Sequence, residues 1–243
     1  LFAEVLRTRA REEAPDLLPR WHQRASAWWE SEGNRRQAIH HALAAHDWDR
    51  AATLIELTWP TLHQQNLRSA FFLTWLAALP EELIRNRPVL CVGYGWELLN
   101  SGELEAADRR LQDAERWLDP AVRAAEAERM IVADEIEFQR LPAEVASARA
   151  YLSLATGDVS ATIHHAQQVL AALPADAYIR RGPAAALLGL AHWVNEELDA
   201  AYTALADGMT GFQKAGNVTF AIAGTYGLAD IRLAQGQLHA AID

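Results

Sequence analysis

The sequence predicts an all-α fold in which antiparallel helix pairs stack into a right-handed superhelical solenoid. The first observation is a signature of a small residue, a turn residue seven positions later, and Ala or Thr five positions after that. Small residues let two helices cross closely, and Gly tolerates the backbone of a tight turn. The four copies are Gly95, Gly102 and Ala107; Ala150, Gly157 and Thr162; Gly189, Glu196 and Ala201; and Ala229, Gly236 and Ala241. The second observation is that β-branched residues are few and no segment alternates with the period of a strand.

The first half of the chain predicts helices of irregular spacing. A Trp-rich helix covers 17–31, and a second helix covers 35–45. The next helix starts at Trp48 and bends or ends at Pro60, because proline has no backbone N–H to donate. Ser69 is a suitable cap for the helix that follows.

The second half predicts a more regular array, beginning at Pro88 in a favoured first helical position. The intervals between successive turn residues of the signature are 55, 39 and 40 residues. The two shorter intervals fit one helix pair with its loop. The longest leaves room for one more helix, which we place at 121–140. The whole chain is expected to contain eleven to thirteen helices.

Two segments show the repeat most fully. Residues 90–120 and 144–174 each combine a small residue, a large apolar residue, a Gly turn, an Ala and a closing Pro. This pattern resembles the tetratricopeptide repeat. The third copy departs from it, with Glu196 in place of the turn Gly and Gly208 in place of the second-helix Ala.

A further resemblance lies in the irregular first half. Residues 21–57 and 75–90 carry a Trp-rich helix, an AI-HALAA segment, a D-x-x-RAA-x-LIE segment and a W-L-x-ALP-x-x-L block, in that order. Together these blocks look like the region that follows the ATPase and winged-helix modules in MalT-like regulators. Those are the large ATP-binding members of the LuxR family, within the signal-transduction ATPases.

That resemblance implies the domain organisation. Residues 1–14 look like the last helix of a winged-helix module, residues 15–243 form a tetratricopeptide-like domain, and both ends are expected to be cut from a longer protein. In such regulators an upstream domain binds ATP, the helical array senses an inducer or an inhibitory partner, and a C-terminal helix-turn-helix activates transcription. We identify neither a P-loop nor a helix-turn-helix in this sequence, so no cofactor, nucleotide contact or DNA contact is assigned to its residues.

Composition argues against several classes of binding partner and location. The net charge of −10 gives no electrostatic footprint for nucleic-acid phosphate and argues against an anionic membrane surface. No apolar run approaches the roughly 20 residues of a membrane span. Cys91 is the single cysteine, so no disulfide forms within the chain, which fits a cytoplasmic location. No catalytic or metal-ligand spacing is found, and we expect a binding module and not an enzyme.

The candidate ligand-binding residues come from tetratricopeptide geometry, in which the first helix of each pair lines the inner groove. The face next to the packed small residues carries aromatic and polar side chains that suit a sugar or another planar ligand. These residues are Trp96, Asn100, Tyr151, Trp193, Tyr226 and Asp230. The alternative is that these side chains only fill contacts between successive repeats.

The sequence therefore favours an effector-sensing helical-repeat module of a MalT-like transcriptional activator. It would bind a small-molecule inducer or a regulatory protein and shift the full-length regulator towards its active state. The alternative is a tetratricopeptide-like scaffold that binds a peptide or protein without any small inducer.

Overall fold

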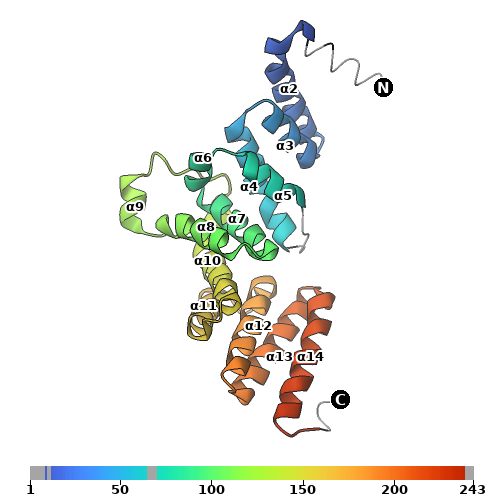
Figure 1. The fold of residues 1–243 in the computed structure, drawn as a ribbon, viewed down its shortest axis with the longest axis vertical. Coiled ribbons are helices and arrows are strands. Elements are labelled where there is room, and N and C mark those ends of the chain that lie inside the picture. The colour runs from blue at the N-terminus through green and yellow to red at the C-terminus, as the bar shows by residue number, and fades with distance from the viewer. Residues whose placement is uncertain (1–8, 10–11, 65–69, 239–243) are drawn as a thin grey trace.

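The computed structural model describes residue 9 and residues 12–64 and 70–238, and in this part of the chain it is entirely helical (Figure 1). Thirteen α-helices follow a short 3₁₀ helix, η1, at Pro15–Leu17. The all-α prediction and the predicted number of helices are confirmed. The helices are α2 Leu18–Ser31, α3 Arg35–Ala44, α4 Trp48–Gln64, α5 Ala70–Ala78, α6 Glu81–Arg85, α7 Pro88–Ser101, α8 Leu104–Arg116, α9 Pro120–Ala125, α10 Glu135–Ala155, α11 Val159–Ala172, α12 Tyr178–Val194, α13 Leu198–Lys214 and α14 Val218–Ala234.

The helices stack in chain order into an elongated array (Figure 1). Helices α2 and α3 lie at one end, α12–α14 lie at the other, and α9 projects to one side. The neighbours α7 and α8, α10 and α11, and α12 and α13 pack as pairs. The predicted cap at Ser69 and the small residue Ala241 lie outside the described residues, as does most of the segment 1–14.

The turns of the repeat signature are built as predicted. Gly102 and Gly157 both have φ of +82°, and Gly236 has φ of +76°. Glu196, which stands where the other copies have Gly, also adopts the left-handed region with φ of +61°. The Cβ atom of a residue other than glycine crowds the backbone in this region, so this turn carries a local strain that the glycine turns avoid.

The small residues of the signature lie where paired helices touch. A Cβ atom added to Gly95 would stand 3.0 Å from Leu111 Cδ2, the end of a flexible side chain. A Cβ atom added to Gly189 would stand 2.6 Å from the backbone nitrogen of Leu205. Ala107 is fully buried in its pair. The helices approach this closely because these positions carry little or no side chain.

The single helix predicted over 121–140 is wrong. Helix α9 ends at Ala125, and the next helix begins only after the side chain of Asp134 accepts the backbone N–H groups of Ile136 and Glu137, both at 3.0 Å. Between them the chain folds back on the core, where the Ala133 N–H donates to Glu56 Oε1 at 2.9 Å. A buried carboxylate needs such donors, and this requirement breaks the helix.

The apolar core is not continuous along the array. One large cluster runs from α3 to α10 and includes Trp59, Phe72 and Leu111. A second cluster lies on α13 and α14. Between them the buried contacts shrink to two small groups, Ala146 with Val169 and Ala184, and Ala150 with Ala166 and Leu187. Helix packing itself continues through α10, α11 and α12. We call the helices around the larger cluster the first body, those around the α13–α14 cluster the second body, and the α10–α12 region between the clusters the joint.

Candidate ligand-binding cleft

A cavity of about 460 Å³ opens at the joint, and we call it the aromatic cleft. Side chains from both bodies line it, so its shape depends on how the two bodies sit against each other. Its lining consists of His63, Trp96, Asn100, Ala143, Glu144, Ser147, Tyr151, Val169, Leu173, Ile179, Arg180, Pro183, Ala186, Leu187, Leu190, Leu205, Met209, Phe212, Ala215, Asn217, Phe220, Ala223, Gly224 and Gly227.

A ladder of four aromatic rings leads from the larger core into the cleft. The ring centroids of Trp59 and His63 are 5.1 Å apart, those of His63 and Trp96 are 5.0 Å apart, and those of Trp96 and Tyr151 are 5.9 Å apart. Trp96 is 8 % exposed, whereas Tyr151 is 37 % exposed. The Trp59 and Trp96 rings are thus held in the core, whereas part of the Tyr151 ring is open to solvent.

One ion-pair network crosses the joint beside the ladder. Arg180 on α12 donates from Nε to Glu144 Oε1 at 2.5 Å and from Nη2 to both carboxylate oxygens of Glu137, at 3.1 and 3.2 Å. Arg140 donates to Glu137 Oε1 at 2.7 Å. Both glutamates lie on α10 and are only 5 % exposed, so α10 and α12 are tied by charge-assisted bonds of low solvent access.

His63 faces this network, with Nε2 4.0 Å from Glu144 Oε2. Its burial lowers the pKa of the imidazole below the ordinary value, since removal from water disfavours the charged form, and the negative charge of Glu144 opposes this shift. Burial therefore favours an uncharged imidazole ring in the lining of the cleft.

The structure brings three of the six predicted ligand residues together. Trp96, Asn100 and Tyr151 all line the aromatic cleft. Their part in binding a ligand stays a prediction, because the geometry fits both a pocket and inter-repeat packing.

The other three predicted residues are not part of the cleft lining. Trp193 packs against the apolar core of the second body. Tyr226 is 74 % exposed, and Asp230 on the same helix is also exposed. The prediction took the same register for every first helix, but the array changes its packing at the joint, so equivalent positions no longer face one groove.

Several residues of the cleft were not predicted from the sequence. Glu144 had a usable signal, since it is an isolated acid within a run of small apolar residues. Met209 and Phe212 had none, because they lie on a second helix, which the repeat pattern assigns to the outer surface. Here both walls of the cavity, and not only the first helices, supply the lining.

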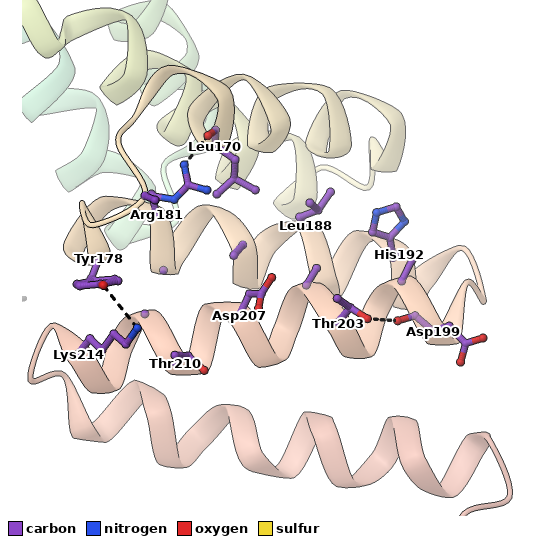
Figure 2. Close-up of a pocket in the computed structure, with 16 residues that line it drawn as sticks. Leu170, Tyr178, Arg181, Leu188, His192, Asp199, Thr203, Asp207, Thr210 and Lys214 are labelled. Atoms are coloured by element: carbon purple, nitrogen blue, oxygen red, sulfur yellow. Dashed lines mark hydrogen bonds between the residues drawn. The ribbon is translucent and has the colours of Figure 1, made fainter.

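A second cavity of about 680 Å³ lies on the opposite face of α12 and α13, with α11 at its edge, and its lining is drawn in Figure 2. Several of its polar groups are hydrogen-bonded within the protein. Lys214 Nζ contacts the Tyr178 hydroxyl at 3.5 Å, and the Thr203 hydroxyl donates to the Asp199 carbonyl at 2.9 Å (Figure 2). Arg181 donates to the carbonyls of Leu170 and Leu173 at the end of α11, which satisfies helix-terminal acceptors. We interpret this face as a contact surface between helices and not as a ligand site.

Other reactive groups are placed unfavourably for chemistry. Cys91 is fully buried, its thiol donates to the Ile84 carbonyl at 3.1 Å, and burial raises its pKa far above the ordinary value. In the part of the chain that the structure describes, no three His, Cys, Asp or Glu side chains gather as metal ligands. None of the described helices is both long enough and apolar enough to span a membrane.

Comparisons with known proteins agree with this architecture. The family described as MalT-like TPR region matches residues 143–243. HTH-type transcriptional regulator MalT from Yersinia pestis (strain Pestoides F) is 32 % identical over 199 residues, which cover 82 % of this chain and 20 % of the relative. The same regulator from Serratia proteamaculans (strain 568) is 28 % identical over 245 residues, covering 100 % of this chain and 25 % of the relative.

The chain therefore spans about a fifth to a quarter of the length of these relatives. No solved structure matches the chain at a significant level. The paired helices, the turns with positive φ and the matched family agree with one another. The chain is MalT-like, with a tetratricopeptide-like helical region similar to part of a transcriptional regulator.

Proposed function

We propose that this region is the effector-sensing module of a MalT-like transcriptional activator, and that a small effector binds in the aromatic cleft. The observation that carries this proposal is the position of the cleft, at the joint between two bodies with separate apolar cores. A ligand there contacts both bodies at once, through Tyr151 on one side and Phe220 on the other.

Such a site converts binding into a change of shape. A ligand shifts an equilibrium only by the difference between its affinities for the two states. An effector that fits one angle between the bodies better than another therefore favours that angle. In a longer regulator this change would alter the contacts of the array with the ATP-binding module that the family resemblance implies, and so couple the effector to activation. In this proposal the region binds the effector and passes the change of shape to the rest of the regulator. It catalyses no reaction itself, and it acts in the cytoplasm.

The test is a calorimetric titration of the chain with a panel of sugars, nucleosides and apolar metabolites. We expect saturable binding of one class, weakened about tenfold or more in Tyr151→Ala, because the ring supplies contact area worth on the order of 1–3 kcal/mol. Tyr226→Ala is the matched control, since it removes the same side chain from an exposed position outside the cleft. Equal affinity of Tyr151→Ala and the parent chain for every ligand bound would remove the cleft from the mechanism.

A second candidate function is recognition of a regulatory protein or peptide. It is favoured by an apolar stripe on α14, where Val218, Ile222, Tyr226 and Leu233 recur at helical spacing and are all well exposed. Two variants distinguish these functions. Tyr226→Ala should weaken the binding of a protein partner and leave the binding of a cleft ligand unchanged. Tyr151→Ala should weaken the binding of a cleft ligand and leave the binding of a protein partner unchanged.

A further inference from the structure

We propose that the ligand of the aromatic cleft is an uncharged amphiphile, with an apolar body and one hydrogen-bonding end. This inference rests on the proposed function, and it names the chemical class that the walls of the cleft select. It follows from how polar and apolar groups are divided between the two bodies.

The polar side chains of the lining come from the first body and from the start of α12. They include His63, Asn100, Glu144, Ser147 and Arg180. Arg180 binds Glu144, and His63 Nε2 lies 4.0 Å from Glu144 Oε2, so these charged and polar groups gather at one end of the cavity. A ligand with hydrogen-bonding atoms would place them at this end.

The opposite wall is almost wholly apolar. It is formed by Leu187, Leu190, Leu205, Met209, Phe212 and Phe220, from α12, α13 and α14. Asn217 is a polar member of this wall, and its side chain already caps α14 by accepting the Phe220 N–H at 3.4 Å. A carbohydrate carries hydroxyls around its whole edge, and each hydroxyl placed against this wall would lose water without gaining a partner. An aliphatic or aromatic body meets no such cost.

The charges at the polar end are already compensated. Arg180 binds Glu144 and Glu137, and Arg140 binds Glu137. An anionic or cationic ligand would have to break these low-access ion pairs, and separating such a pair is costly. The cleft therefore favours a ligand without formal charge.

Two partly exposed side chains of the lining, Asn100 and Ser147, supply an amide and a hydroxyl to a ligand with a hydrogen-bonding end. The cavity volume of about 460 Å³ suits a small molecule, since ligand pockets typically range from roughly 300 to 1,000 Å³.

The test uses the uncharged fluorophore N-phenyl-1-naphthylamine with the full 243-residue chain. We expect a saturable rise in its emission that n-decanol reverses, while the trisaccharide raffinose does not and sodium decanoate does so more weakly than n-decanol. Phe220→Asn, which changes a partly exposed residue of the apolar wall, should weaken displacement by n-decanol about five- to tenfold. Ile222→Asn, two positions along the same exposed helix and outside the cleft, should leave it unchanged.

Four outcomes would overturn the assignment. Equal effects of the two asparagine variants, or no displaceable emission at all, would show that the apolar wall is not the binding surface. Tighter binding of decanoate than of decanol would contradict an uncharged ligand. Binding of raffinose that Tyr151→Ala weakens, with no displacement by decanol, would replace the amphiphile with a carbohydrate and leave the proposed effector site intact. The proposed function itself fails only if no small molecule binds in a way that depends on Tyr151.

Discussion

From α3 to α10 the helices are held by large side chains such as Trp59, Phe72 and Leu111, whereas α12 and α13 meet nearly backbone to backbone. In that second contact a Cβ atom on Gly211 would come within 2.8 Å of Gly182 Cα, and one on Gly208 within 2.8 Å of the Ala186 nitrogen. One repeat signature thus supports two kinds of packing. Interdigitated side chains build a thick core, and glycine seams build a thin, closely spaced pair.

This difference explains where the cleft lies. The helices also pack closely across α10–α12, but there the buried apolar contacts are mainly alanines and an ion-pair network carries part of the connection. A joint built this way has less apolar contact to resist a change of angle than the cores on either side of it. Three perturbations should affect the two bodies differently, and the largest effect is expected for the first.

The largest effect should come from the buried ion pair of the first body. Glu56 is fully buried, accepts from Arg87 Nη1 at 3.2 Å and also binds the Ala133 N–H. Glu56→Ala leaves Arg87 buried without its partner, which costs about 3–5 kcal/mol of unfolding free energy. Hydrogen exchange resolved by peptide would show this loss across α3–α10 and a much smaller change across α12–α14.

The matched control is Asp49→Ala. The Asp49 carboxylate lies 3.9 Å from Arg87 Nη2, but its side chain is 79 % exposed, so its removal should cost less than about 1 kcal/mol. A loss of protection spread evenly over both bodies in Glu56→Ala would contradict the division into two cores.

A smaller effect should separate the two kinds of packing directly. Alanine favours a helix interior over glycine by about 1 kcal/mol. In Gly95→Ala the new methyl meets only the flexible end of Leu111, so the gain roughly offsets the crowding. In Gly189→Ala it meets the Leu205 backbone, and forced separation of the helices should cost about 1–3 kcal/mol. Urea unfolding of both variants measures this difference. Equal urea midpoints for the two variants would mean that both helix pairs accommodate the added methyl group equally well.

The smallest effect should appear on acidification. Burial lowers the pKa of His63 from 6.5, so below pH 6.5 the unfolded chain takes up the proton more readily than the folded chain. The contribution of His63 to stability is therefore present above pH 6.5 and is lost as the pH falls through the lowered pKa. Thermal unfolding at pH 7.5 and 5.5 should show a smaller decrease in His63→Gln than in the parent chain. His164→Gln, at an exposed position, should keep the parent's full decrease.

Local patterns made much of the array predictable. The turn positions Gly102 and Gly157 follow from short-range rules, because a left-handed residue between two helices is a property of a few neighbouring residues. Trp96 and Tyr151 were identified as cleft residues from their register alone. The break of the helix expected over 121–140 was not predictable in this way, since Glu56, whose carboxylate binds the segment, lies far away in the sequence.

The all-α class and the helix pairing follow from local sequence, because helical periodicity and small-residue spacing are encoded over short stretches. The MalT-like character follows from the resemblance of the sequence blocks in 21–57 and 75–90. Other features appear only in the packed structure: the apolar clusters are separate at α10–α12, Trp193 and Tyr226 are not part of the cleft lining, and α13 supplies an apolar wall. Those features depend on the angle between successive pairs. That angle results from many contacts between residues far apart in the chain, which no local pattern records.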